Sequence, residues 1–326
     1  MRLGLGFFSS RAVLSAVELG LFSELAKGAR DEPALRQQLG IHPRASRDFF
    51  DGLVALGLLE RRGSRYHNSA DAALYLDRAK PSYVGGLLEM CARRLYAFWG
   101  SLTEALRTGS PQNEAKTGGN FFERIYSDPA QLRGFLTAMT GVSVAPARAI
   151  ARRFPWRKYQ TFYDVGGAQG CVPVQVALTH KHLTGGEFDL PPVGPIFEDY
   201  VRSFGLEKRL AFVAGDFFKD PLPSADVLIM GHVLHDWDLE QKQMLLNKAY
   251  ATLPKGGVLI VYDSIIDDAR KANVAGLMMS LNMLIETPGG FDYSGADCRR
   301  WMKQAGFRKS SVEHLAGPEA MVIGVK

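Results

Sequence analysis

Polar residues that could do chemistry recur at one kind of position in the second half of the chain, close behind apolar runs. They are Asp164, Asp189, Asp216, His235 and Asp263. The apolar runs predict buried parallel strands, and open α/β sheets bind ligands at the carboxyl ends of their strands. An imidazole there can act as a general base, and carboxylates can hold ammonium groups or hydroxyls. We therefore interpret these residues as one ligand site, although the histidine alone could instead make a local hydrogen bond at a helix start.

The stretch at 161–172, TFYDVGGAQGCV, predicts a strand that runs through a tight turn into a helix. Its glycines let a ligand approach the backbone, and a helix start offers unpaired N–H groups. Asp189, at the end of the next predicted strand, is placed to hold a ribose diol. Because the spacing is GGxxG and not the GxGxxG of dinucleotide sites, the loop favours a mononucleoside cofactor such as S-adenosylmethionine. A glycine turn that merely connects strand to helix is the alternative.

Two histidines, His232 and His235, lie three residues apart in the segment GHVLHDWD. Histidine is a common zinc ligand, but zinc sites in proteins need three or four protein ligands. Since no third ligand of metal type follows at a suitable spacing, the sequence predicts no metal site.

The composition is that of an ordinary globular protein. Of 326 residues, 46% are hydrophobic and 22% charged, and the length fits two domains. The cysteines Cys91, Cys171 and Cys298 have neither metal nor disulfide spacing, which predicts a reducing, cytoplasmic location. The apolar N-terminus is interrupted by Arg11 and Glu18, which argues against a signal peptide or a membrane span.

The first part of the chain has the pattern of a winged-helix unit. Helices are expected at 7–26, 31–40 and 44–59, followed by a short hairpin at 61–66. The helix at 7–26 has more apolar surface than one small domain can bury, which favours pairing with a second subunit in a homodimer.

DNA binding is the competing hypothesis for this unit. Residues 1–160 contain 23 Lys and Arg against 14 Asp and Glu, a charge of +9, whereas residues 161–326 contain 16 against 20, or −4. The arginines that would reach the major groove or the phosphates are Arg44, Arg47, Arg61, Arg62 and Arg65. Asp48 and Asp51 on the same predicted helix would repel phosphate, so nucleic-acid binding is the weaker hypothesis.

The rest of the chain predicts an α/β fold. Helices are expected at 82–108 and 119–153, and Phe154-Pro155-Trp156 ends this helical region. Strands are expected at 161–165, 184–189, 210–214, 225–230, 257–263, 308–314 and 320–325, with helices between them, for example at 237–252. This alternation predicts a doubly wound, mostly parallel seven-stranded sheet that ends in an antiparallel hairpin.

In order and spacing, the motifs DVGGAQG, FDLPPV, GDFF, VLHDWD, LPKGGVLIVYD and TPGGFD resemble those of S-adenosylmethionine-dependent O-methyltransferases of the hydroxyindole, caffeate and polyketide type. The resemblance covers nearly the whole chain, and VLHDW together with FDLP is its specific part. It implies a winged-helix dimerisation domain at 1–100 and a class I methyltransferase domain at 101–326. Within the latter, 101–155 would be a helical connection and 156–326 a Rossmann-like catalytic core.

The resemblance also implies a cofactor and site residues: S-adenosylmethionine, leaving as S-adenosylhomocysteine, and no metal. The catalytic residues would be His235 as general base with Asp263 and Asp292 beside it. The cofactor would contact Asp164, Gly166, Gly167, Gly170, Asp189, Leu190, Asp216, Phe217, Gly231 and Trp237. The aromatic acceptor would contact Phe135, Met139, Asn282 and Met283, and a partner subunit's N-terminal helix would bring Phe7 and Phe8 to it.

Three features depart from the family pattern. Ala168 and Gln169 replace a glycine and a small polar residue in the glycine loop, and Gly231 stands where plant members have a lysine that helps to bind the cofactor. Both acids beside the histidine are one methylene shorter than the usual glutamates. Their hydrogen bonds to the histidine are therefore expected to be longer or to run through water.

Methyl transfer to a hydroxyl requires the acceptor's proton to leave. A phenol has a pKa of about 10 and histidine about 6.5, so complete transfer is uphill by about 4.8 kcal/mol unless the neighbouring acid raises the basicity of the histidine. We therefore expect a phenolic acceptor, and the Met-rich segments 135–139 and 277–285 suit a flat aromatic ring. The other hypotheses are a relative with altered chemistry (N- or C-methylation, or cofactor-dependent hydroxylation or decarboxylation) and a ligand-sensing DNA-binding protein.

Overall fold

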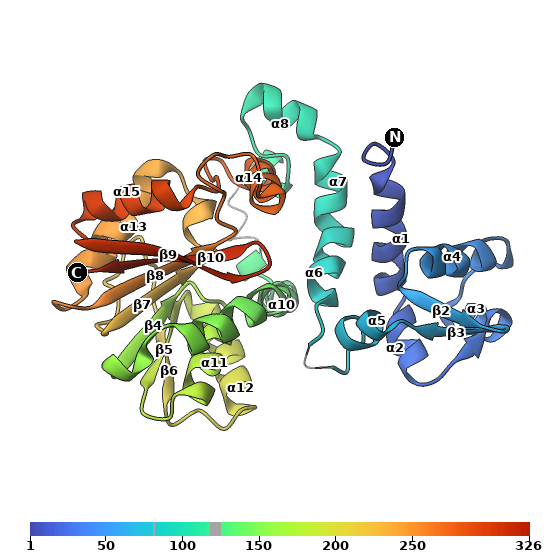
Figure 1. Cartoon of the computed structure of the whole chain (residues 1–326), viewed down its shortest axis with the longest axis horizontal. Coiled ribbons are helices and arrows are strands. Elements are labelled where there is room, and N and C mark those ends of the chain that lie inside the picture. Colours follow the sequence, from blue (N-terminus) through green and yellow to red (C-terminus); the bar gives the residue numbers. More distant parts are fainter. Residues whose placement is uncertain (81, 118–124) are drawn as a thin grey trace. The chain divides into compact units, whose positions relative to one another are not determined.

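The computed structural model describes residues 1–80, 82–117 and 125–326. The chain divides into two compact units, 1–97 and 98–326 (Figure 1). In the part of the chain that is described, no helix is both long and apolar enough to cross a membrane.

The first unit combines helices with a small antiparallel sheet. Its elements are α1 (Gly6–Glu18), α2 (Leu21–Ala26), β1 (Arg30–Asp31), α3 (Glu32–Leu39), α4 (Pro43–Ala55), β2 (Leu59–Arg62), β3 (Arg65–Asn68), α5 (Ala70–Tyr75), α6 (Gly85–Met90) and a π-helical turn at Cys91–Leu95. The strands pair in the order β1-β3-β2. The predicted hairpin after the third helix is confirmed, and Gly63 turns the chain between β2 and β3 with φ 61°.

Two predicted helix bounds in this unit are wrong. The helix expected at 7–26 is divided into α1 and α2 because Gly20 has left-handed backbone, with φ 71°. The helix expected to reach residue 59 ends at Ala55, since Gly57 has φ 76° and Leu59 already begins β2. A left-handed residue cannot continue a right-handed helix, and glycine adopts this conformation at the lowest cost.

Two of the arginines suggested for DNA contacts are held by one carboxylate. The Nη1 atom of Arg61 lies 2.6 Å from Asp51 Oδ1, and Nε of Arg47 lies 3.9 Å from Asp51 Oδ2. The hydroxyl of Tyr66 also donates to Asp51, at 2.8 Å. These contacts use charge that a phosphate backbone would require.

The helices expected at 82–108 and 119–153 are observed as shorter helices. The one at 82–108 is interrupted into α6, the π-helical turn, α7 (Tyr96–Trp99) and α8 (Leu102–Thr108), and a 3₁₀ turn follows at Glu114–Thr117. The one at 119–153 is observed as α10 (Pro129–Arg153), while residues 119–124 lie outside the described residues. Asp128 caps α10 by accepting the N–H groups of Ala130 and Gln131, and proline suits the first helical position.

The second unit is built around a seven-stranded sheet in the order β6-β5-β4-β7-β8-β10-β9. The strands are β4 (Thr161–Val165), β5 (Thr184–Asp189), β6 (Leu210–Ala214), β7 (Val227–Gly231), β8 (Val258–Asp263), β9 (Lys309–Ala316) and β10 (Glu319–Val325). The strands from β6 to β8 pair in parallel, whereas β10 is antiparallel to both of its neighbours. The predicted mostly parallel sheet with a C-terminal antiparallel hairpin is confirmed.

Helices cover both faces of this sheet (Figure 1). They are α10, α11 (Cys171–Thr179) and α12 (Gly194–Arg202) on one face, and α13 (Leu239–Thr252) and α15 (Gly295–Ala305) on the other. A hydrophobic core lies on each face of the sheet. Along β7, Val227 and Ile229 belong to the core under α10, α11 and α12, whereas Leu228 and Met230 belong to the core under α13 and α15, as the two-residue period of a strand requires. Burial of both faces explains why this strand is almost wholly apolar.

Candidate functional site

The carboxyl ends of five parallel strands meet at one edge of the sheet. Strand β4 pairs with β5 on one side and β7 on the other, so the strand order reverses beside β4. Open α/β sheets bind ligands at such a reversal. Asp164, Asp189 and Asp263 occupy the last two positions of their strands, and Asp216 and His235 follow theirs within four residues.

The loop after β4 is tightly turned and is braced by β5. Left-handed backbone occurs at Gly166, Ala168 and Gly170, with φ of 73°, 64° and 90°. The N–H of Gly167 donates to Glu187 Oε1 at 2.6 Å, and the N–H of Ala168 donates to Asp189 Oδ2 at 3.2 Å. The other oxygen of Asp189 accepts the N–H of Leu190 at 2.7 Å. The second strand therefore fixes the loop that the sequence predicted as the cofactor turn.

Three acidic side chains, Asp164, Glu187 and Asp189, are buried under this loop. Neither oxygen of Asp164 and only one oxygen of Glu187 has a hydrogen-bond partner in the described part of the chain. Burial and the neighbouring charge of Asp189 raise the pKa of Asp164 to about 8, and burial raises the pKa of Asp189 to about 7. Buried acceptors without donors are costly, so the cluster fits a ligand that has positive charge and N–H donors, such as an ammonium group.

Glu187 is a site residue that the sequence did not reveal. It was visible only as part of a predicted strand end. The available signal was its position two residues before Asp189, because alternate residues of a strand lie on the same face. A Cβ at Gly167 would lie 2.2 Å from Asp164 Oδ2 and 2.6 Å from Glu187 Oε2, so this position requires glycine.

Aromatic rings line the site beyond β6 and β7. The ring of Trp237 meets Phe217 and Phe218 edge-on, with centroids 5.9 and 4.6 Å away. Phe217 also lies close to the glycine loop, since a Cβ at Gly166 would be 3.4 Å from its ring. The carboxylate of Asp216 is turned into its own loop, where Oδ1 accepts the N–H of Phe218 at 2.9 Å.

His235 is 6% exposed and lies in a 3₁₀ turn after β7. Its Nδ1 is hydrogen-bonded to Asp292 Oδ1 at 3.2 Å and lies 3.5 Å from Asp263 Oδ1. Its Nε2 lies 3.7 Å from Asp236 Oδ1. Both acids that the sequence placed beside the histidine thus meet its Nδ1, at distances above the usual 2.9 Å of such bonds, as their shortened side chains predict.

The acids around His235 change its basicity. Burial alone would lower the pKa of His235, but the negative charges of Asp263, Asp292 and Asp236 outweigh it and raise the pKa to about 10. The raised pKa brings His235 closer to a phenol, whose pKa is about 10, so proton transfer from a phenol is less uphill than to an ordinary histidine. The hydroxyl of Tyr293 donates to Asp263 Oδ2 and fixes that acid.

Lys242, on α13, is a second residue that the sequence did not reveal. Its side chain is fully buried, and its Nζ donates to the carbonyl of Trp237 and lies 3.5 Å from the centre of the Phe291 ring. Burial lowers the pKa of Lys242 to about 8 against the opposing effect of the acids around His235. The lysine thereby connects Trp237, two residues after His235, to Phe291, the residue before Asp292. The signal was its spacing from Leu245, Leu246 and Ala249, which form the buried face of the helix.

Tyr262 explains the glycine at position 231. A Cβ built on Gly231 would lie 1.9 Å from Cε1 and 2.5 Å from the hydroxyl of Tyr262. Because Tyr262 is buried, its ring has little room to move aside. The place that a lysine would need is therefore filled by the tyrosine ring.

We expect Gly231→Ala to destabilise the protein by about 1 to 3 kcal/mol, the usual cost of overpacking a core. The measurement is the calorimetric melting temperature. Gly134→Ala is the matched control, because Gly134 lies inside α10 and a Cβ built on it meets no described atom within 4 Å outside the backbone of its own helix. This variant should gain about 0.5 to 1 kcal/mol in free energy of unfolding. Equal melting temperatures of the Gly231→Ala variant and the parent would contradict the proposed overlap with Tyr262.

The four predicted acceptor contacts lie on two helices. Phe135 and Met139 are on α10, where Phe135 packs against a small apolar cluster that includes Leu132 and Leu136. Asn282 and Met283 are on α14 (Val274–Glu286). A hydrogen bond connects this helix to the start of the second unit, because the indole N–H of Trp99 donates to Asn282 Oδ1 at 2.9 Å. Met283 is buried.

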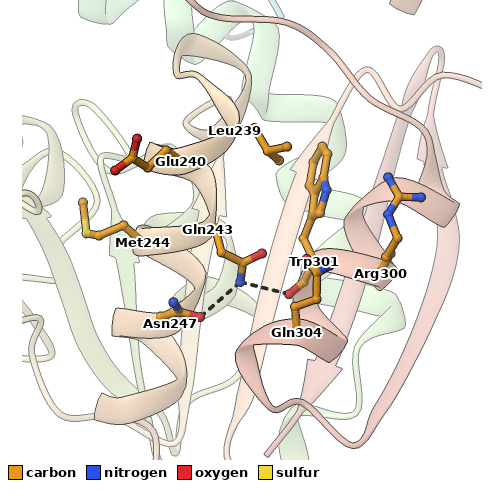
Figure 2. Close-up of a pocket in the computed structure, with 8 residues that line it drawn as sticks. All are labelled: Leu239, Glu240, Gln243, Met244, Asn247, Arg300, Trp301 and Gln304. Atoms are coloured by element: carbon orange, nitrogen blue, oxygen red, sulfur yellow. Dashed lines mark hydrogen bonds between the residues drawn. The ribbon is translucent and has the colours of Figure 1, made fainter.

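A surface groove between α13 and α15 is separate from these residues (Figure 2). It is lined by Leu239, Glu240, Gln243, Met244, Asn247, Arg300, Trp301 and Gln304. The side-chain amide of Gln243 bridges it, donating to Asn247 Oδ1 at 3.1 Å and to the carbonyl of Trp301 at 3.2 Å. None of the predicted site residues lines the groove.

The spacing along the sequence shows no third metal-type ligand beside His232 and His235, but the fold brings one close to them. Asp263, at the end of β8, meets both histidines, and one ligand atom from each of the three residues lies within 4.8 Å of the others. The sequence could not show this, because the pairing of β7 with β8 brings together residues about 30 positions apart.

Comparison with known proteins identifies the family. The family model for an O-methyltransferase domain matches residues 99–308, and the model for an O-methyltransferase dimerisation domain matches residues 1–78. The chain is 43% identical over 327 residues to the tetracenomycin polyketide synthesis 8-O-methyl transferase TcmO of Streptomyces glaucescens, covering 100% of this chain and 96% of that protein. It is 38% identical to the N,N-dimethyltransferase OxyT of Streptomyces rimosus, covering 97% and 92%.

Among solved structures, human N-acetylserotonin methyltransferase in complex with SAM superposes with a TM-score of 0.92 at 28% identity, covering 100% of this chain and 96% of that one. Sequence and fold therefore agree. The chain belongs to the O-methyltransferase family and is an S-adenosylmethionine-dependent O-methyltransferase.

Proposed function

We propose that this enzyme methylates a phenolic hydroxyl of an aromatic small molecule, with His235 taking the proton. The observation that carries this proposal is the pairing of His235 Nδ1 with Asp292 and Asp263. With the Nδ1 proton donated to these acids, Nε2 keeps its lone pair and can accept a proton from the acceptor. Asp292 and Asp263 also stabilise the imidazolium that forms.

The residues around the glycine loop are proposed to hold the cofactor. Asp164 and Glu187 have buried oxygens that accept no hydrogen bond from the described residues and could accept its ammonium group, and Asp189 can accept its ribose hydroxyls. Phe217 and Trp237 offer ring surface for its adenine. When bound, S-adenosylmethionine supplies an electrophilic methyl group on a sulfonium. The role of the protein is to orient the acceptor oxygen behind that methyl group and to exclude water.

The raised pKa of His235 supports a phenol as the class of acceptor. A base whose pKa is raised toward that of a phenol removes a phenolic proton readily, whereas an aliphatic alcohol is far less acidic. Phe135, Met139, Asn282 and Met283 are the proposed contacts to the ring, since methionine adapts to flat aromatic shapes.

We further propose that the unit at 1–97 forms a homodimer. Phe7 and Phe8 on α1 are 53% and 60% exposed, and exposed aromatic residues of this size usually have a partner surface. In such a dimer, these rings would complete the acceptor site of the other subunit.

The test of the function is product analysis. The enzyme is incubated with S-adenosylmethionine and two matched aromatic acceptors, one with a phenolic hydroxyl and one with an amine in its place. We expect a mass gain of one methyl group on the phenolic oxygen, located by fragmentation. Methylation of the amine alone would instead support the N-methylation that the name of OxyT suggests.

The pH dependence should report the charge cluster at His235. The base must be neutral to act, so kcat/KM should rise with pH, with a midpoint well above the usual histidine pKa of about 6.5. Asp292→Asn removes a negative charge, so the pKa of His235 falls and the midpoint should move to lower pH by about 1 to 3 units. The same acceptor is used for both proteins, so its own ionisation cancels. A midpoint that stays in place would remove Asp292 from this role.

A further inference from the structure

Two histidines approach one carboxylate oxygen beside the reaction site. Nδ1 of His235 lies 3.5 Å from Asp263 Oδ1, and Nδ1 of His232 lies 3.7 Å from the same atom. A tetrahedral Zn²⁺ with bonds of about 2.0 to 2.2 Å holds its ligand atoms about 3.3 to 3.6 Å apart. The two nitrogen–oxygen distances, without an ion, are therefore within a few tenths of an ångström of those between the ligand atoms of a zinc site.

The shared oxygen points into the cluster without a donor. Asp263 Oδ1 is buried and accepts no hydrogen bond from the described residues, while Oδ2 is held by the Tyr293 hydroxyl. Asp292 Oδ1, 3.2 Å from Nδ1 of His235, is a fourth ligand atom in reach. Two imidazoles and two carboxylates suit Zn²⁺, whereas Mg²⁺ prefers six oxygen ligands in an octahedron.

Each histidine also has a carboxylate on its far nitrogen. Nε2 of His232 lies 3.6 Å from Glu319 Oε2, and the other oxygen of Glu319 accepts the Ser264 hydroxyl at 2.6 Å. Nε2 of His235 lies 3.7 Å from Asp236 Oδ1. Both separations exceed hydrogen-bond length. A carboxylate that closes to hydrogen-bond distance of such a nitrogen would orient a metal-binding histidine and increase its affinity for the ion.

The backbone supports the same arrangement. His232 has φ 53°, a left-handed conformation that few residues other than glycine adopt. Its ring is packed edge-on against Tyr262, with centroids 5.1 Å apart. In this conformation Nδ1 of the imidazole lies 3.7 Å from Asp263 Oδ1.

We propose that His232, His235 and Asp263, with Asp292, form an inhibitory Zn²⁺ site. The ion is an inhibitor here and has no part in methyl transfer. Bound to Nδ1 of His235, it takes the place of the Nδ1 proton, so the remaining ring proton is on Nε2. The nitrogen that should accept the acceptor's proton is then occupied, and turnover stops. The effect on turnover rests on the proposed function, whereas zinc binding does not.

The first experiment measures binding, using the full-length chain freed of metal and titrated calorimetrically with zinc chloride. Cys91→Ser is introduced into every protein, because Cys91 is the partly exposed cysteine and Cys171 and Cys298 are buried. We expect one tight site per chain. His232→Asn should weaken it by at least about tenfold, and asparagine tolerates the left-handed backbone at this position.

His182→Asn is the matched control, because His180 and His182 form the other close histidine pair, with ring centroids 6.0 Å apart. It should leave zinc affinity unchanged, and magnesium chloride should give no heat from this site. Equal zinc affinity in His232→Asn and its parent, or loss of binding in His182→Asn alone, would overturn the proposal.

The second experiment measures the consequence. Zinc should abolish methylation by the parent, and excess EDTA should restore it, while calorimetric affinity for S-adenosylhomocysteine stays the same. His232→Asn should retain its turnover without zinc and need at least about tenfold more zinc for inhibition. A chain that binds zinc but methylates no hydroxyl would refute the proposed function only. A chain that methylates a phenol yet binds no zinc would refute the metal site only.

Discussion

Replacing His235 by alanine is expected to lower kcat by about 10²- to 10⁴-fold, the usual contribution of a positioned general base. The imidazole is the group whose Nδ1 meets Asp292 and Asp263 and whose pKa those acids raise. The neighbouring His232 has its Nδ1 3.7 Å from Asp263 Oδ1, and no contact of its ring with Asp292 is found among the described residues. Because the glycine loop is on other strands, affinity for S-adenosylhomocysteine should change by less than about threefold, or about 0.6 kcal/mol. Single-turnover kinetics and calorimetry measure the two quantities.

A second variant protects this prediction from a folding artefact. Alanine leaves Asp263 and Asp292 without their cation, and an unpaired buried charge can unfold a protein. His235→Gln keeps an N–H donor for Asp292 but has no basic nitrogen, so it should fold, bind the cofactor product and remain slow. Methylation by the glutamine variant at the parent's rate would show that the proton leaves by another route.

Asp164→Asn is expected to weaken cofactor binding and, at the same time, to stabilise the unliganded protein. Hydrogen bonds to charged groups contribute about 1.5 to 3 kcal/mol, so losing the carboxylate should raise the Kd by about 10- to 150-fold. The unliganded carboxyl group, however, is buried, and neither of its oxygens accepts a hydrogen bond from the described residues. Removing an unsatisfied buried charge should increase the free energy of unfolding by about 1 to 2 kcal/mol, or about 2 to 8 °C in melting temperature.

The pH dependence of this gain has a definite sign. Folding raises the pKa of Asp164 from 3.8 to about 8, chiefly through burial, so the unfolded chain ionises first. The acid therefore destabilises the protein increasingly as pH rises from about 4 to about 8. The asparagine variant should accordingly gain most at pH 8 and little near pH 4.

Asp199→Asn is the control, because Asp199 is exposed and pairs with Arg133 and Arg202 at the surface. It should change stability by less than about 0.5 kcal/mol and leave cofactor affinity unaltered. An Asp164→Asn variant with the parent's cofactor affinity would make Asp164 a structural residue. A lower melting temperature at pH 8 would show that the carboxylate has a stabilising partner.

Much of the sheet could be predicted from the sequence because its signals are local. Buried parallel strands need near-continuous apolar runs, so the strands that precede Asp164 and His235 were recognisable one by one. The ends of helices were harder to predict from the sequence. Glycine is tolerated inside a helix as well as at its end, so the residue type alone does not show that Gly20 and Gly57 take left-handed backbone.

The sequence by itself determined the alternation of strands and helices and the acid or histidine that follows each central strand, since both depend on neighbouring residues along the chain. Only the tertiary structure decided which of these groups meet. Glu187 braces Gly167, Lys242 lies beneath the segment that carries His235, and Asp263 joins His232. The physical reason is that pKa values, unpaired oxygens and ligand geometry depend on distances between strands, and strand pairing sets those distances for residues far apart in the chain.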